Sequence, residues 1–174
     1  MVDRVGNRYA EAIYQLALEE KKVSEIHKTL EEVESLFTDN IDFKQFLTHP
    51  LIGREEKHNL ISKIFGDEGT IEQNILFYLI DKGRINEIKS IAQEFKALYY
   101  KDNNIIDVKA TFAKELSQEQ KDKLVEKLKK STGKTINLEV LLEPELIGGG
   151  IIRIGDKVID GSLRSQLETL GKRR

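Results

Sequence analysis

Hydrophobic residues recur at helical spacing through roughly the first hundred residues of the chain. After an apolar first segment the pattern appears over residues 23–37, 43–47, 60–65, 71–82 and 85–99. Thr70 and Gln73 have the spacing of a helix-opening capping box, and Gly66 and Gly83 follow apolar stripes as C-terminal caps do. Because the connections between these segments are short, the pattern predicts an all-α unit of antiparallel helices over residues 1–104.

Two of the predicted helices carry more apolar surface than one core contact requires. On the first, apolar side chains span more than half of the circumference at about 100° per residue. They are Val5, Tyr9, Ala10, Ala12, Ile13, Tyr14, Leu16, Ala17 and Leu18. The helix over 71–82 is apolar on all sides, because six apolar residues follow one another from Ile75 to Ile80. One interpretation is that both helices lie centrally in the bundle. The other is that each helix packs one side inward while its other side forms an apolar groove for a partner helix.

The pattern changes after about residue 103 to alternation of apolar and polar positions, which is typical of strands. Strands are predicted over 106–112, 136–142, 147–154 and 157–159, with a helix between the first two that opens at Ser117 and ends at Gly133. Leu163, Leu167 and Leu170 indicate a final helix. The expected fold class is therefore α+β: a helical unit followed by a small α/β module (strand–helix–strands–helix) over residues 105–174.

Composition excludes several classes of function. The 174 residues carry a formal net charge of -2, so generic nucleic-acid binding is disfavoured. The chain has no cysteine, which excludes disulfides and thiolate chemistry. No segment approaches the roughly 20 apolar residues of a membrane span, so we expect no direct membrane insertion and any membrane association through a partner.

The run Gly148-Gly149-Gly150 is the one feature that invites a catalytic interpretation. A phosphate-binding loop needs such glycines before a helix, whereas here the apolar, strand-like Ile151–Ile154 follows and no Gly-Lys-Ser/Thr motif occurs. A bend or bulge between strands is the favoured interpretation. The three histidines, His27, His49 and His58, have no ligand spacing and are expected on the surface. We therefore expect no enzyme, no metal and no cofactor.

The C-terminal run resembles the signature of the delta subunit family of F-type ATP synthase, which includes the mitochondrial oligomycin-sensitivity-conferring protein. The matching residues are Ile136, Leu138, Leu142, Glu143, Leu146, Gly148, Gly149, Ile152, Arg153 and Gly155, followed by Asp156, Val158, Ile159, Asp160, Gly161 and Ser162. Arg8-Tyr9-Ala10-x-Ala12 and Gly83-Arg84-Ile85 resemble the family as well. The glycine triplet departs from it, since many members have one small residue before a glycine pair.

The resemblance implies a non-catalytic stator subunit, present in one copy in the peripheral stalk of a proton-translocating ATP synthase. It implies a six-helix bundle that binds the N-terminal helix of an alpha subunit, and a C-terminal module that binds the C-terminal helices of the b subunits. The groove for the alpha helix would lie between the first and fifth helices. The groove residues carried over are Tyr9, Ala12, Ile13, Leu16, Ile75 and Tyr78. The expected location is the cytoplasmic face of the bacterial cell membrane, peripherally attached.

Two other classes compete with this interpretation. A soluble helical adaptor, such as a chaperone cofactor, would explain the helices and a groove but not the C-terminal signature. An enzyme using the glycine run would require nucleotide binding.

Overall fold

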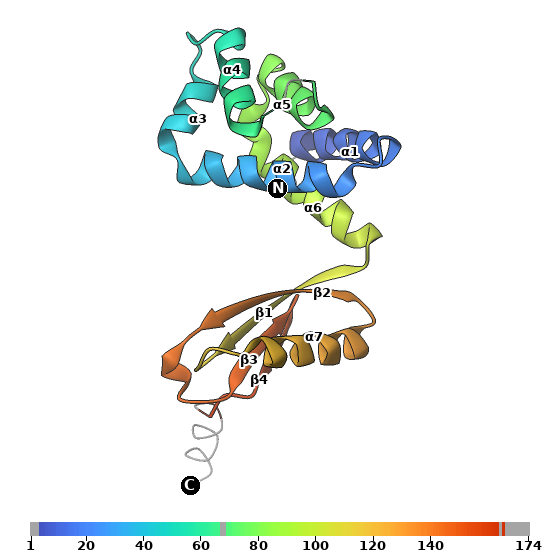
Figure 1. Cartoon of the computed structure of the whole chain (residues 1–174), viewed down its shortest axis with the longest axis vertical. Coiled ribbons are helices and arrows are strands. Elements are labelled where there is room, and N and C mark those ends of the chain that lie inside the picture. The colour runs from blue at the N-terminus through green and yellow to red at the C-terminus, as the bar shows by residue number, and fades with distance from the viewer. Residues whose placement is uncertain (1–3, 67–68, 164, 166–174) are drawn as a thin grey trace. The chain divides into compact units, whose positions relative to one another are not determined.

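The computed structural model describes residues 4–66, 69–163 and 165, and the chain divides into two compact units (Figure 1). The first unit is Met1–Tyr99 and the second is Tyr100–Arg174. The division falls inside a helix, about four residues before the hydrophobic pattern changes near residue 103. Each unit has its own secondary structure.

The first unit is helical. Its elements are α1 (Arg4–Glu19), α2 (Val23–Asp39), α3 (Ile41–Thr48), α4 (Arg54–Phe65), α5 (Ile71–Asp81), the 3-10 turn η1 (Ile85–Glu87) and α6 (Ile88–Asp102). The predicted caps are present: Gly66 and Gly83 have φ of 79° and 65° after α4 and α5. The Thr70 hydroxyl accepts from the Gln73 N–H at the start of α5, but the Gln73 side chain donates to the Gly66 carbonyl instead of closing the capping box.

The core of the first unit is built from the predicted apolar stripes. Phe95 on α6 is fully buried, and its ring meets that of Tyr14 on α1 edge to face, with centroids 5.3 Å apart. The stripe of α2 supplies Ile26, Leu30 and Val33, which are all buried. Aromatic pairs in this geometry stabilise a core beyond the area they bury.

The surface assignment is wrong for His27, and His58 is only partly exposed. The His27 ring stacks on Tyr99 of α6 with centroids 4.7 Å apart, and its side chain is only 12% exposed. The His58 ring stacks on Phe77 at 4.2 Å, while its Nε2 lies 3.1 Å from Oδ1 of Asp81. In both cases the aromatic partner comes from another helix, so the sequence neighbours of the histidine could not indicate it.

The second unit is a mixed sheet with one helix against it (Figure 1). Its elements are β1 (Ile105–Phe112), α7 (Gln118–Thr132), β2 (Thr135–Leu142), the 3-10 turn η2 (Pro144–Leu146), β3 (Gly150–Ile154) and β4 (Lys157–Asp160). The strand order is β2-β1-β3-β4, with β1 and β2 parallel and the other pairs antiparallel. Parallel neighbours need a crossover connection, which α7 provides.

The alternating pattern assigns the two faces of this sheet. Val108 and Ala110 of β1 are fully buried and pair in register with Leu138 and Val140 of β2. The intervening positions face the other side, where Lys109 Nζ lies 3.0 Å from the Glu139 carboxylate.

One strand is shorter than the pattern predicts. β3 begins at Gly150 instead of residue 147, because η2 precedes it and Ile147 has φ of 65°, outside the extended region. The predicted final helix lies outside the described residues apart from Leu163 and Ser165.

These observations confirm the α+β class. Within the described ranges the chain forms seven α-helices, of which six begin before the sheet, and one four-stranded sheet. The finer description of the first unit as a six-helix bundle stays a prediction.

We expect Phe95→Ala to lower the free energy of unfolding of the helical unit by about 3–5 kcal/mol, because it empties a fully buried ring site. Leu51→Ala is the control, since Leu51 is 88% exposed and its loss should change stability by less than about 0.5 kcal/mol. Urea unfolding followed by circular dichroism measures both. Equal stabilities of the two variants would contradict the assigned core.

Candidate functional site

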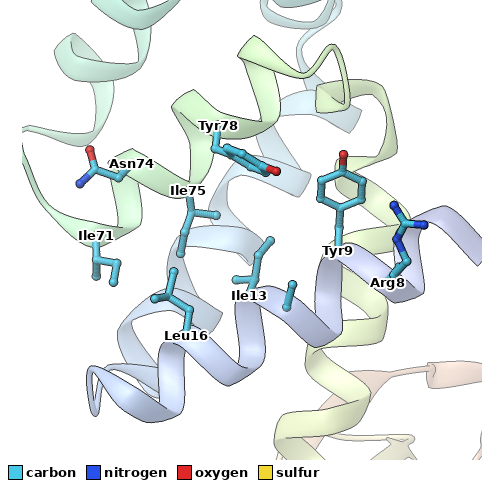
Figure 2. Close-up of a pocket in the computed structure, with 9 residues that line it drawn as sticks. Arg8, Tyr9, Ile13, Leu16, Ile71, Asn74, Ile75 and Tyr78 are labelled. Carbon is cyan, nitrogen blue, oxygen red and sulfur yellow. The ribbon is translucent and has the colours of Figure 1, made fainter.

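The first unit has an apolar groove between α1 and α5 (Figure 2). Its volume is about 530 Å³, and it is lined by Arg8, Tyr9, Ala12, Ile13, Leu16, Ile71, Asn74, Ile75 and Tyr78. All six residues that the sequence assigned to a partner-binding groove are among these nine. The structure therefore brings together two segments that lie about sixty residues apart in the chain.

α1 divides its broad apolar surface between the core and the groove. Tyr14 and Ala17 are buried in the core, whereas Tyr9 is half-buried and Leu16 is 37% exposed on the groove side. Ile13 lies between the two sides and is 6% exposed. One helix thus serves two surfaces, which explains why its apolar residues cover more than half of its circumference.

α5 is buried more completely than α1. Of its six consecutive apolar residues, Ile75, Leu76, Leu79 and Ile80 are buried. Phe77 packs on His58, and only Tyr78 is exposed, at 51%. The two interpretations left open by the sequence therefore both hold in part: α5 is central to the core, and one edge of it still forms a groove wall.

The groove is apolar with one aromatic, cationic end. The rings of Tyr9 and Tyr78 face each other across the groove with centroids 6.3 Å apart (Figure 2). Arg8 is the one charged residue among the lining residues, and the Lys82 ammonium lies 5.4 Å from the centre of the Tyr78 ring. These side chains can bury an apolar surface and pair with an anion, but they contain no nucleophile with an adjacent base.

Sequence reasoning missed three of the lining residues. Ile71 and Asn74 precede Ile75 and Tyr78 by one helical turn each, so the i, i+4 spacing placed them on the same face. Arg8 precedes Ala12 by the same i, i+4 spacing. Helical spacing alone would have found all three.

Other kinds of site have no support in the described part of the chain. No group of three or more His, Asp or Glu side chains there is arranged to hold a metal ion. No described helix is both long and apolar enough to cross a membrane.

The glycine run in the second unit lies where two backbone segments cross closely, the start of β3 and the segment after β4. A Cβ on Gly149, whose φ is 74°, would overlap the Gly161 carbonyl oxygen, and a Cβ on Gly150 would come within 2.5 Å of the Phe112 ring. The Gly161 N–H donates to the Gly150 carbonyl at 2.9 Å, and the Leu163 N–H donates to the Gly148 carbonyl at 2.9 Å. The run therefore fastens the segment after β4 to the start of β3, where side chains would not fit.

Two other signature residues lie at or near the far end of β3. Gly155, with φ of 55°, opens the two-residue turn between β3 and β4, and the exposed Arg153 pairs in register with Lys109 and Val158. The turn is thus built where the sequence placed it.

Asp160 holds the start of the crossing segment. Its carboxylate accepts from the Ser162 backbone N–H at 2.9 Å, and this bond together with the Ser162 hydroxyl keeps the pKa of Asp160 below its usual value of 3.8. Ser162 is itself only 2% exposed, and its hydroxyl accepts from the Ser165 N–H. The carboxylate is therefore ionised at neutral pH and acts as a structural acceptor.

Together the fold and the groove define a two-unit α+β protein whose prominent described surface feature is an apolar groove formed by two helices. Residues 5–173 match the family described as ATP synthase delta (OSCP) subunit. The chain therefore belongs to this family, whose members are structural, non-catalytic subunits of the peripheral stalk.

Individual relatives agree with this assignment. The chain is 48% identical to ATP synthase subunit delta of Fusobacterium nucleatum over 169 residues, which is 97% of each chain. It is 47% identical, with the same coverage, to the Propionigenium modestum protein named ATP synthase subunit delta, sodium ion specific. In the solved Toxoplasma gondii mitochondrial ATP synthase hexamer, one chain superposes with a TM-score of 0.68 over 98% of this chain and 97% of that one. At 19% identity the last similarity supports the fold alone.

We expect Gly149→Ala to destabilise the second unit by more than Gly155→Ala does. Both glycines have positive φ, so alanine costs roughly 1–2 kcal/mol of backbone strain at either position. At Gly149 the new methyl also meets the Gly161 carbonyl, whereas nothing lies within 4 Å of a Cβ at Gly155. Hydrogen exchange of the β1 and β3 amides in the full chain measures the difference. Equal protection in the two variants would contradict the close crossing.

Proposed function

We propose that the chain is the stator subunit that links the catalytic head of an ATP synthase to the b subunits and resists the torque of the rotor. The observation that carries this proposal is the α1–α5 groove in a chain that matches the delta (OSCP) family over residues 5–173. In this proposal α1–α6 act as a single six-helix bundle that presents the groove. The chain enters the hetero-oligomeric complex in one copy.

The groove is suited to an amphipathic helix, and we assign to it the N-terminal helix of an alpha subunit. Leu16 and Tyr78 present exposed apolar surface, while the buried Ile13 and Ile75 form the floor between them. A helix laid along this surface would bury apolar side chains over its length, so that lateral force is shared among many weak contacts. A stator contact needs this property because rotor torque loads it continuously.

The second unit is assigned to the C-terminal helices of the b subunits. It carries exposed apolar side chains that its own described residues leave uncovered: Leu141, Leu142, Ile147, Val158 and Ile159. Leu141 and Val158 lie on one face of the sheet, Leu142 and Ile159 on the other, and Ile147 lies on the turn before β3. Such exposure is common at interaction surfaces. The glycine crossing would keep these side chains in one arrangement under load.

The subunit would be attached peripherally, on the cytoplasmic face of a bacterial cell membrane, through the rest of the complex. Because two relatives are named sodium ion specific, we widen the expected coupling ion from protons to either protons or sodium.

The two competing classes have less support. A helical adaptor unrelated to the synthase does not account for a family match that includes the whole second unit. A nucleotide-binding enzyme would need an open glycine loop, but Gly148, Gly149 and Gly150 are packed against Leu163, Gly161 and Phe112.

The groove is tested by Leu16→Asp, which we expect to weaken binding of an alpha-subunit N-terminal peptide by about 10-fold or more. The new carboxylate would be buried against an apolar helix without a partner. Leu18→Asp is the matched control, because Leu18 lies on the same helix, is 45% exposed and is not among the groove residues. Calorimetric titration of both full-length variants measures the affinities. Equal affinities would remove the groove as the binding site.

The two proposed attachments should be separable. We expect the Leu16→Asp chain to bind a soluble C-terminal fragment of the b subunit as tightly as the native chain, because Leu16 belongs to the other unit. Pull-down and calorimetry with that fragment measure this. Loss of both partners in a chain whose circular dichroism is native would contradict the separate sites.

A further inference from the structure

The charges around the groove are distributed unequally along its length. At one end Arg8 lines the groove, and the Lys82 ammonium lies over the Tyr78 ring at 5.4 Å. Tyr9 and Tyr78 form facing walls of the groove beside Arg8 (Figure 2). The end near Leu16 and Ile71 has no cation among its lining residues; instead the exposed Glu19 follows Leu16 by one turn of α1.

No carboxylate in the described part of the chain forms an ion pair with Arg8 or Lys82. The two acidic residues of α5 that lie nearest in sequence to the groove walls are paired elsewhere. Glu72 lies 3.4 Å from Lys22 and Asp81 lies 3.1 Å from His58. None of the nine lining residues is acidic. Arg8 and Lys82 therefore have no carboxylate partner in the described structure.

We propose that the bound helix places a carboxylate side chain against Arg8, at the end of the groove where Lys82 lies over Tyr78, and that this contact sets the register and direction of the helix in the groove. The proposal rests on the proposed function, because it concerns the occupant of the same groove. An apolar groove alone accepts an amphipathic helix in several registers, since apolar contacts are not directional. A charged pair at one end favours one register and penalises a helix that would place a cation there.

The surroundings of the two cations strengthen this contact. When a helix covers Tyr9 and Tyr78, water is removed from the guanidinium of Arg8 and the ammonium of Lys82, and charge-assisted hydrogen bonds are stronger where water is excluded. Arg8 can also bind a carboxylate through two N–H groups, which fixes orientation as well as distance.

The test is a double-mutant cycle on the full-length chain. The probe is a synthetic peptide of the first 25 or so residues of the alpha subunit from the same organism, with a series in which each Asp or Glu is replaced in turn by Asn or Gln. The chain variants are Arg8→Gln and Lys82→Gln, with Arg54→Gln as the control, because Arg54 is exposed at the start of α4 and away from the groove lining. Affinities are measured by calorimetry at low and at high salt.

We expect Arg8→Gln to weaken binding of the native peptide about 3- to 10-fold at low salt, with a smaller effect at high salt because of screening. One position of the peptide should couple to it: replacing that carboxylate should have little further effect in the Arg8→Gln chain. Arg8→Glu should regain affinity for a peptide with Lys at that position, and Arg54→Gln should bind like the native chain.

Two results would overturn the proposal. One is native affinity of both Arg8→Gln and Lys82→Gln for the unaltered peptide; the other is a peptide series in which no single position couples to Arg8. In either case the peptide affinity of the Leu16→Asp chain tests the proposed function separately. If Leu16→Asp still weakens the peptide, the groove is correct and only the cationic end has been misassigned. If Leu16→Asp also binds normally, the groove assignment fails with it.

Discussion

The helical unit depends on the burial of α5. Six consecutive apolar residues place apolar side chains on every side of this short helix, so it is stable only when other helices cover most of its surface. Four of the six are buried, and the stack of Phe77 on His58 together with the His58–Asp81 pair fastens α5 to α4. The groove wall formed by Ile75 and Tyr78 is thus the edge of a helix that is held in place from behind. This support matters for the proposed function, because a helix packed on several sides resists local unfolding.

In the second unit the corresponding support comes from main-chain hydrogen bonds instead of side-chain packing. The chain after β4 must return close to the start of β3, and three glycines allow the two backbones to approach and exchange hydrogen bonds. The ionised Asp160 and the buried Ser162 complete this contact. The glycine run, which at first invites a phosphate-binding interpretation, is therefore already occupied by the protein's own main chain.

Both units are consistent with a protein that transmits force and performs no chemistry. Apolar burial in a groove distributes strain over many contacts, and a charged end adds direction without requiring a deep pocket. A closely packed crossing in a small sheet limits the ways in which an exposed apolar surface can rearrange. The family match identifies a structural subunit of the ATP synthase, and the groove lining contains no catalytic arrangement.

The sequence by itself determined the elements, their order and the α+β class, because periodicity and capping are local properties. Thr70, Ser117 and Gly133 lie at the helix ends that their spacing indicates. It also identified the helices with excess apolar surface. Tertiary structure alone decided how that surface is shared: Tyr14 faces the core while Leu16 remains exposed, and α5 retains only Tyr78 on the outside. It also decided the environments of His27 and His58, the late start of β3 and the charge at one end of the groove. These features depend on which residues of distant segments meet, and the pattern along one segment contains no information about its neighbours in space.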